Sequence, residues 1–323
     1  MSKSRLRIAV LTSGGDAPGM NAAVRSVVRS TIAEGGDAFG IEHGYEGLLG
    51  EMFRPLAIGD VGGILDRGGT FLGTSRSDRF MTEEGVAEAA EILARHEIDG
   101  LVVVGGDGSY RGAEALHARG VKVIGLPGTI DNDVSGTDTS IGFDTALNTI
   151  CDAVAKVRDT ASSHERTFVI EVMGRSCGIL ATYAGLACGG DCILVPEVAW
   201  RIEDVWACIT SGVKRGKRHS LIILAEGAGH AFGLAQELNR LYEHDVRSVV
   251  LGHVQRGGSP SAFDRILASR MGAHAVASLL AGESGCAVGL RGAQTVTYQL
   301  EEAYEHGHAL RREIYELAGI LAK

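Results

Sequence analysis

The sequence predicts a parallel α/β protein, and three features of the chain point to this fold class. Short runs of Val, Ile and Leu alternate with segments of helical periodicity along most of the chain. These runs lack a strict alternation of polar and apolar residues, which is typical of strands covered on both faces. Several runs end in glycine-rich turns. Alternating strands and helices of this kind form parallel sheets through right-handed crossovers.

Each expected strand is a run of aliphatic residues bounded by turn-forming or charged residues. The expected strands span residues 6–12, 99–106, 121–127, 167–174, 191–196, 220–227 and 247–253. The segments between them carry apolar residues at helical spacing. The expected helices span residues 19–34, 83–97, 143–160, 177–188, 202–214, 232–243 and 260–281.

The chain is long for a single hydrophobic core, so two α/β lobes are expected. It has 323 residues, and single cores usually stop growing at about 250–300 residues. No Pro- or Ser-rich linker marks a boundary, which is consistent with a chain that crosses between the lobes more than once. The expected lobes are residues 1–142 with 255–305 and residues 143–254 with 306–323.

Composition and charge exclude several classes of protein. The chain has 31 basic and 40 acidic residues, a net charge of −9, and is 45% hydrophobic. This hydrophobic fraction is too high for disorder, and an acidic chain without a basic tail argues against nucleic-acid binding. No apolar run approaches the ~18 residues that span a bilayer, and no signal peptide is evident. We expect a cytoplasmic protein whose six cysteines are reduced, mostly buried thiols.

Two glycine-rich turns follow expected strands in the first half. Thr12–Asn21 contains adjacent glycines and Pro18, and it leads into a helix whose N-terminus favours an anion; it could equally be an ordinary tight turn. Gly105–Ser109 resembles a weak dinucleotide fingerprint, but Asp107 lies inside it. A carboxylate beside a phosphate-binding turn is better explained as a Mg²⁺ ligand.

A third turn, Pro127–Asp133, carries Asp131 and Asp133 directly after a strand. One carboxylate could act as a general base and the other as its electrostatic partner, although a solvated turn with Asp caps is the alternative. In the second half, polar residues follow the strands. Arg175, Glu226, His253 and Arg256 are expected to form a cleft for a sugar phosphate.

Taken together, these segments resemble the ATP-dependent 6-phosphofructokinase family over nearly the whole chain. The resemblance rests on TSGGDAPGMN (12–21), RGGTFLGTSR (67–76), GGDGS (105–109), PGTIDND (127–133), SSHER (162–166), EVMGRSCG (171–178) and GHVQRGGSP (252–260). It implies two Rossmann-like lobes with mainly parallel sheets flanked by helices, one for ATP and one for fructose 6-phosphate, in a homotetramer. It also implies transfer of the ATP γ-phosphoryl to the sugar 1-hydroxyl.

The resemblance assigns roles at matching positions. Asp131 would be the general base, assisted by Thr129, Arg175 and Arg76, and Asp107 would hold Mg²⁺. The implied ATP contacts are Gly15, Arg76, Ser77, Gly106, Asp107, Gly108 and Ser109. The implied sugar-phosphate contacts are Thr129, Asp131, Met173, Gly174, Arg175, Glu226, His253 and Arg256, together with Arg166 and Arg247 from a neighbouring subunit.

The resemblance further implies an effector site for a nucleoside diphosphate or phosphoenolpyruvate. The matching residues are Arg25, Arg29, Arg158, Asp191, Arg215, Lys217 and His219. Two departures make its response a hypothesis: Asp191 replaces a common Glu, and Ile58 stands where an Arg often lies. A further departure concerns the ATP site, since residues 77–82 do not clearly align with the family's second basic ATP contact, for which Arg79 could substitute.

Two alternatives remain for the reaction. Pyrophosphate-dependent relatives typically carry Asp at position 108 and Lys at 128, whereas this chain has Gly108 and Gly128, so ATP is the expected donor. An NAD-dependent dehydrogenase is disfavoured because Asp107 would repel the pyrophosphate of a dinucleotide. In addition, the next strand ends in Leu126-Pro127 and not in an acidic residue that could bind a ribose.

Overall fold

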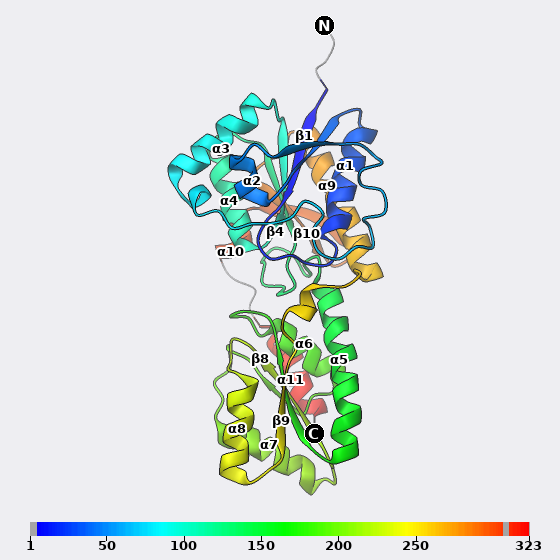
Figure 1. Ribbon diagram of the computed structural model, residues 1–323, viewed down its shortest axis with the longest axis vertical. Coiled ribbons are helices and arrows are strands. Elements are labelled where there is room, and N and C mark those ends of the chain that lie inside the picture. Colours follow the sequence, from blue (N-terminus) through cyan, green and yellow to red (C-terminus); the bar gives the residue numbers. More distant parts are fainter. Residues whose placement is uncertain (1–4, 306–309, 323) are drawn as a thin grey trace. The chain divides into compact units, whose positions relative to one another are not determined.

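Two compact units make up the computed structural model, which describes residues 5–305 and 310–322 (Figure 1). Unit 1 comprises Met1–Thr145 and Arg256–Gly307, and unit 2 comprises Ala146–Gln255 and His308–Lys323. The first two crossings lie within three residues of the expected positions, 142 and 255. The third expected crossing, at 305–306, borders residues that lie outside the described part of the chain.

Unit 1 contains a seven-stranded sheet of order β11-β10-β5-β4-β1-β2-β3. Five adjacent strands are parallel, and the outermost strand on each side runs antiparallel to its neighbour. The strands are β1 (Arg7–Thr12), β2 (Asp37–Ile41), β3 (Phe53–Leu56), β4 (Gly100–Gly105), β5 (Val123–Pro127), β10 (Cys286–Arg291) and β11 (Gln294–Gln299). The three central strands β1, β4 and β5 are almost completely buried, because helices cover both faces.

The helices of unit 1 form two layers, with α1 packed on α9 and α3 packed on α2 and α4 (Figure 1). They are α1 (Met20–Ala33), α2 (Gly44–Leu49), α3 (Glu83–Arg95), α4 (Asp107–His117), α9 (Ala262–Leu280) and α10 (Glu302–Glu305), with a 3₁₀ turn η1 (Arg79–Met81).

Unit 2 contains a four-stranded parallel sheet of order β7-β8-β6-β9. Its strands are β6 (Thr167–Val172), β7 (Cys192–Leu194), β8 (Ser220–Ala225) and β9 (Val246–Val250). The associated helices are α5 (Phe143–His164), whose first turn belongs to unit 1, α6 (Ile179–Cys188), α7 (Ile202–Lys214), α8 (Ala231–Tyr242), α11 (Arg312–Leu321) and the 3₁₀ turn η2 (Gly252–Arg256).

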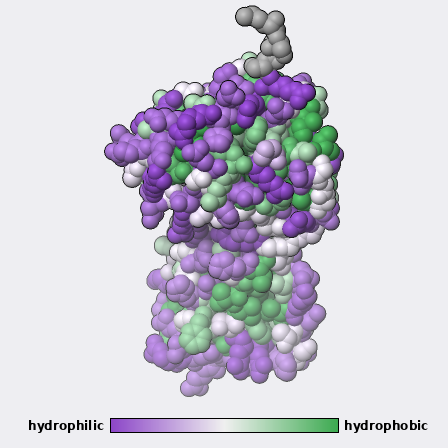
Figure 2. All heavy atoms as spheres, turned by 45° about the horizontal axis from the view of Figure 1, so that its top comes forward, coloured by the Kyte–Doolittle hydropathy of each residue, from purple (hydrophilic) through white to green (hydrophobic). Residues whose placement is uncertain are grey.

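On the face drawn in Figure 2, both units carry mostly hydrophilic side chains with apolar patches between them. Exposed large apolar side chains include Phe232, Val254, Ile266 and Ile320. Among the described helices, none combines the length and apolarity that a bilayer crossing requires.

The predicted α/β class with mainly parallel sheets is confirmed, but the sequence reading missed several elements. The strands β2, β3 and β11 lack a long aliphatic run and are partly exposed, since they lie at or near the sheet edges. Strand β10 is almost completely buried, but its sequence CAVGLR also lacks a long aliphatic run. Helix α4 is not among the predicted helices, because it begins at Asp107, inside the glycine-rich Gly105–Ser109 segment that was expected to form a turn. The short or terminal helices α2, α10 and α11 were also missed.

Asp264 links the start of α9 to the start of α5 within unit 1. Its fully buried carboxylate accepts hydrogen bonds from the Gly142 amide at 2.9 Å, the Thr145 amide at 2.8 Å and the Thr145 hydroxyl at 2.5 Å. Burial raises the pKa of Asp264 to about 6, despite these hydrogen bonds. The segment that follows the Pro127–Asp133 turn is thereby attached to the α1–α9 layer.

Substitution of Asp264 by Asn tests this linkage through its pH dependence. The pKa of Asp264 is higher in the folded chain than its ordinary value of 3.8, so its favourable contribution is present at low pH and lost as the pH rises through about 6. The quantity to follow is the difference in unfolding free energy, wild type minus Asp264→Asn. We expect this difference to decrease by about 3 kcal/mol as the pH rises from roughly 4 to 7.

Urea denaturation across this pH range measures the difference. Glu91→Gln, which changes an exposed side chain on α3, is the control. Its difference in unfolding free energy from wild type should not vary with pH. A pH-independent difference for Asp264→Asn would contradict the prediction.

Candidate functional site

Three loops lie side by side at one edge of the unit 1 sheet. The strands β1, β4 and β5 are adjacent and parallel, with Thr12 paired to Val104 and Gly105 paired to Pro127. Their carboxyl ends therefore meet at one edge, where parallel sheets bind ligands. The segments that leave this edge are the three turns singled out from the sequence.

The turn after β1 is tied to the neighbouring strand and to the Arg67–Arg76 loop. The Ser13 amide donates to the Val104 carbonyl at 2.9 Å, and the Thr74 hydroxyl donates to the Gly14 carbonyl at 2.8 Å. The buried Asn21 side chain accepts from the Phe71 amide at 2.6 Å and donates to the Arg67 carbonyl at 3.0 Å. Hydrogen bonds therefore hold the glycine-rich turn after β1 against the glycine-rich Arg67–Arg76 loop.

Arg256 lies against this turn. A Cβ atom at Gly15 would stand 2.2 Å from Nη1 of Arg256, so only glycine permits the observed approach. The same Nη1 donates to the Asp16 carbonyl at 3.3 Å. Arg256, expected from the sequence to contact a sugar phosphate, thus lies in unit 1 beside the expected ATP turn.

Helix α4 begins within the second turn. Gly106 is its N-cap, and Asp107, Gly108 and Ser109 form its first turn. The Ser109 carbonyl accepts from the Tyr45 hydroxyl at 2.6 Å. A Cβ atom at the exposed Gly108 would meet no atom within 4 Å. Such a helix N-terminus with open space beside it is suited to bind an anion.

The third turn holds Asp131 in a buried, closed loop. Asp131 is 3% exposed, and its amide donates to the Thr129 hydroxyl at 3.2 Å. Asn132 adopts a φ of 54° and accepts from the Ser140 amide at 2.7 Å. The Thr129 amide donates to the Ile141 carbonyl at 3.1 Å. The structure therefore brings Asp131 and Thr129 together, beside the α4 turn on the adjacent strand.

The carboxylates of this edge do not form a protein-only metal centre. Within residues 5–305 and 310–322, no group of three or more His, Cys, Asp or Glu side chains could hold a metal ion. Mg²⁺ is usually bound by one or two carboxylates together with phosphate oxygens and waters. The half-buried Asp107, at the start of α4, fits a metal that arrives with a phosphate ligand.

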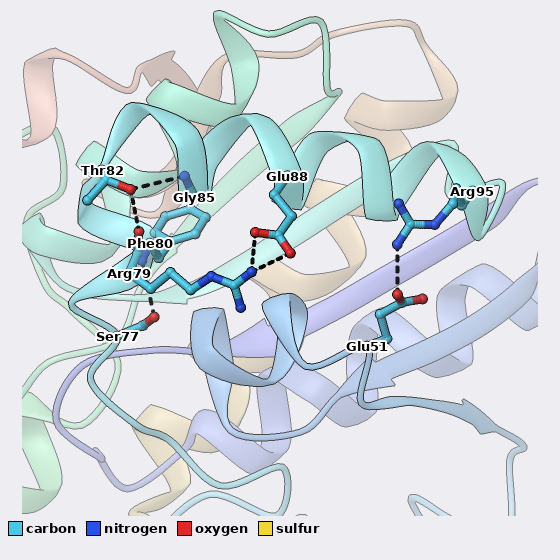
Figure 3. Close-up of polar contacts among 8 residues, drawn as sticks. All are labelled: Glu51, Ser77, Arg79, Phe80, Thr82, Gly85, Glu88 and Arg95. Atoms are coloured by element: carbon cyan, nitrogen blue, oxygen red, sulfur yellow. Dashed lines mark hydrogen bonds and ion pairs between the residues drawn. The ribbon is translucent and has the colours of Figure 1, made fainter.

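The expected basic ATP contacts occupy the segment before α3. Arg76 is exposed, and the Ser77 hydroxyl accepts from the Phe80 amide of η1 at 3.2 Å. Arg79 is turned away to Glu88 of α3 and forms an ion pair with both of its carboxylate oxygens (Figure 3). Both arginines are exposed, but Arg79 is engaged with Glu88 of α3.

In unit 2, Glu226 organises the residues that follow β6. Its Oε1 atom accepts from the amides of Gly174 at 3.2 Å and Arg175 at 2.7 Å. Gly174 has a φ of 137° and Arg175 a φ of 53°, so the turn adopts a conformation that the carboxylate helps to hold. The sequence suggested a hydroxyl contact for Glu226 and missed this backbone role.

The other expected sugar-phosphate residues of this edge follow β6 and β9. Met173 is buried, and its amide donates to Oε1 of the fully buried Gln255 at 3.2 Å. His253 is exposed on η2. Since β8, β6 and β9 are adjacent and parallel, Arg175, Glu226 and His253 share the carboxyl edge of this sheet.

Arg166 and Arg247 lie at the opposite edge of the same sheet. Arg166 precedes β6 and Arg175 follows it, and a strand of six residues spans roughly 20 Å. Asp245 bridges the two arginines, with Oδ2 2.6 Å from Nε of Arg166 and Oδ1 2.8 Å from Nε of Arg247. Desolvation opposes ionisation, but both guanidinium groups lower the pKa of Asp245 overall. The fold thus divides the expected sugar-phosphate residues of unit 2 into two groups.

Four of the expected effector residues line a single pocket of about 260 Å³ in unit 2. They are Arg158, Asp191, Lys217 and His219, and the pocket also contains Cys188 and Arg218, which the sequence reading missed. The Asp191 carboxylate forms an ion pair with Lys217 and accepts from the Leu221 amide at 2.9 Å.

The remaining effector candidates are not in this pocket. Arg215 donates to the Ser211 hydroxyl at 2.7 Å and to the Ala322 carbonyl at 3.2 Å. Arg25 and Arg29 are half-buried on α1 of unit 1. Ile58, which stands where the family that the sequence resembles often has an Arg, is 49% exposed.

Fold and site together define an α/β protein with a sheet edge suited to bind anions, and the comparisons with known proteins specify it further. Residues 7–279 match the phosphofructokinase family. The chain belongs to the phosphofructokinase family, whose members are phosphotransferases with an alcohol acceptor. This membership sets aside the dehydrogenase alternative.

Its relatives include bacterial and fungal proteins. The chain is 54% identical to an ATP-dependent 6-phosphofructokinase of Listeria welshimeri, covering 98% of this chain and 99% of the relative. It is 52% identical to an ATP-dependent 6-phosphofructokinase of Bacillus thuringiensis, covering 97% and 98%. A solved phosphofructokinase of Saccharomyces cerevisiae matches 97% of this chain and 46% of its own, with 39% identity and a TM-score of 0.87.

Removal of the Glu226 carboxylate tests its role in holding the turn after β6. Glu226→Ala leaves two amides without their acceptor, so we expect a loss of about 1–3 kcal/mol in the free energy of unfolding. Glu226→Gln retains an amide oxygen and is expected to lose less. Chemical denaturation measures stability, and hydrogen exchange at Gly174 and Arg175 reports the local loosening. Equal stability of all three proteins would refute the assignment.

Proposed function

We propose that the chain is an ATP-dependent 6-phosphofructokinase of the cytoplasm, which transfers the γ-phosphoryl group of ATP to the 1-hydroxyl of fructose 6-phosphate. The observation that carries the proposal is the adjacency of β1, β4 and β5, since it places a glycine turn, a helix N-terminus and the buried Asp131 along one edge. The names of the curated relatives support the same reaction in glycolysis.

The first two turns would hold the nucleotide. Backbone amides of the Gly15 and Gly106–Ser109 segments would face the phosphates, with Arg76 and Ser77 completing the contacts. Asp107 would hold Mg²⁺, which when bound neutralises charge on the phosphate oxygens. Phosphoryl transfer depends chiefly on such positioning and charge neutralisation.

Asp131 would take the proton of the sugar 1-hydroxyl as the attacking oxygen forms its bond to phosphorus. Thr129 holds the backbone of Asp131 and would contact the reacting region. The closed loop matters here because a general base must lie within hydrogen-bond reach of the proton it removes. Arg76 and Arg175 would stabilise the charge that develops on the transferring group.

The two groups of polar residues in unit 2 suggest how the sugar phosphate is shared. Met173, Gly174, Arg175, Glu226 and His253 would bind fructose 6-phosphate from one chain, and Arg256 is a further proposed contact. Arg166 and Arg247 would bind the 6-phosphate held by a neighbouring subunit of a homotetramer. Their position some 20 Å along β6 from Arg175 favours this division. Asp245 would keep the two guanidinium groups aligned for bidentate contacts.

The pocket lined by Arg158, Asp191, Lys217 and His219 would bind an anionic effector, a nucleoside diphosphate or phosphoenolpyruvate. Its cationic lining supports this role. Arg25, Arg29 and Arg215 would contribute from outside the pocket.

Replacement of Asp131 tests the general-base assignment. Asp131→Ser or Asp131→Asn should lower kcat on the order of 10²-fold or more, with little change in KM for fructose 6-phosphate. A coupled assay of fructose 1,6-bisphosphate formation measures both constants, and Glu91→Gln is the control. Near-normal turnover of the Asp131 variants would overturn the assignment.

The donor is tested at Gly108. The wild type should turn over faster with ATP than with pyrophosphate, because the open space at Gly108 leaves room for the nucleotide. A Cβ at Gly128 would stand 3.0 Å from both Met20 and Val104, so the lysine typical of pyrophosphate-dependent relatives is disfavoured there.

Gly108→Asp should raise KM for ATP roughly 10-fold, since its carboxylate repels phosphate, and Gly108→Ala is the uncharged control. Faster turnover of wild type with pyrophosphate would reject the choice of donor.

A further inference from the structure

Two thiols of unit 2, distant in sequence, are in contact beside the anionic-effector pocket. Cys151 lies on α5, and Cys188 is the last residue of α6. Their sulfur atoms are 3.4 Å apart. Cys151 is half-buried, whereas Cys188 is 8% exposed and lines the pocket. No role in the phosphofructokinase reaction proposed above uses either thiol.

We propose that Cys151 and Cys188 form a modification site, a dithiol that a peroxide oxidises reversibly to a disulfide. A disulfide bond is about 2.05 Å long, so the two sulfur atoms need to approach by only about 1.4 Å from their observed contact. The site itself rests on this contact and not on the proposed catalytic activity.

The chemistry assigns a different part to each thiol. The hydrogen bond from Cys188 lowers the pKa of Cys151 to about 7, so a thiolate forms readily near neutral pH. That thiolate attacks one peroxide oxygen, which gives a sulfenic acid and releases hydroxide. That hydroxide takes up the proton that Cys151 lost, which gives one water. Cys188 then attacks the sulfenic sulfur, and its proton leaves with the sulfenic hydroxyl group as the second water. Two thiols and one hydrogen peroxide thus become one disulfide and two waters.

A second thiol pair nearby is less suited to this reaction. Cys208 donates a hydrogen bond to the Asp191 carbonyl at 2.9 Å, and Cys192, its neighbour, packs against the apolar core around β8. The hydrogen bond between them raises the pKa of Cys192 and lowers that of Cys208, the same pattern as in the first pair, so packing is what distinguishes the two pairs. Oxidation of this pair would disturb the core.

The position of Cys188 connects the dithiol to the pocket. Its carbonyl accepts a hydrogen bond from the Arg158 guanidinium, and Asp191 lies three residues further along the same wall. Movement of Cys188 toward α5 would shift the carbonyl that holds Arg158. We therefore expect oxidation to weaken anion binding in the pocket; this step rests on the proposed effector role.

Peptide mapping of the purified chain tests the modification site. The reduced protein is treated with hydrogen peroxide, its remaining thiols are blocked, and the digest is analysed without reduction. We expect a linked Cys151–Cys188 peptide that dithiothreitol separates and that Cys151→Ser and Cys188→Ser abolish. Cys286→Ser in unit 1 is the control and retains it. Absence of this peptide in wild type, or preferential linkage of Cys192 to Cys208, would overturn the proposal.

Calorimetric titration with phosphoenolpyruvate tests the connection to the pocket. Oxidised wild type should bind at least roughly 5-fold more weakly than reduced wild type, whereas peroxide should leave the affinity of Cys151→Ser unchanged. Equal affinity of the two wild-type forms would reject the connection. The effector role is rejected if reduced wild type binds no phosphoenolpyruvate, or if Lys217→Ala binds it as tightly as reduced wild type. The connection between the dithiol and the pocket is then rejected as well. In that case the linked peptide alone tests the dithiol proposal.

Discussion

The parallel alignment of β5, β4 and β1 is the constraint on which the unit 1 site depends. Neighbouring strands lie about 4.8 Å apart, so turns that leave adjacent carboxyl ends are held within the dimensions of a polyphosphate. The register that pairs Gly105 with Pro127 and Val104 with Thr12 places the three turns level with one another. A helix N-terminus, a glycine turn and a buried carboxylate are therefore juxtaposed by backbone hydrogen bonding.

Buried and half-buried polar side chains hold the site loops in shape. Asn21, Asp264 and Glu226 accept hydrogen bonds from backbone amides of segments distant from their own. Asn132 accepts one from the Ser140 amide within its own loop. These loops have little regular backbone pairing, and a buried amide without an acceptor is costly. The side chains supply the missing acceptors, which limits the motion of the residues that would face substrates.

Charge in this acidic chain is organised locally. Asp245 joins Arg166 to Arg247, Glu88 binds Arg79, and Asp191 pairs with Lys217 in the pocket of unit 2. The net charge of −9 is compatible with polyanionic ligands because salt screens exposed charges beyond about 10 Å. A bound phosphate would interact mainly with the nearby guanidinium groups and amides, and with the carboxylates that orient them.

The sequence by itself determined the α/β class, the central strands and the turns that carry Gly15, Asp107 and Asp131, because aliphatic runs and glycine spacing are local signals. Only the tertiary structure decided the edge strands, the backbone role of Glu226, the Asp245 bridge and the contact of Cys151 with Cys188. The physical reason is that each of these depends on segments far apart in sequence, 37 residues for the thiols and 79 for Asp245 and Arg166. Packing of strands and helices brings such residues together, and the local periodicity of the sequence does not indicate these contacts.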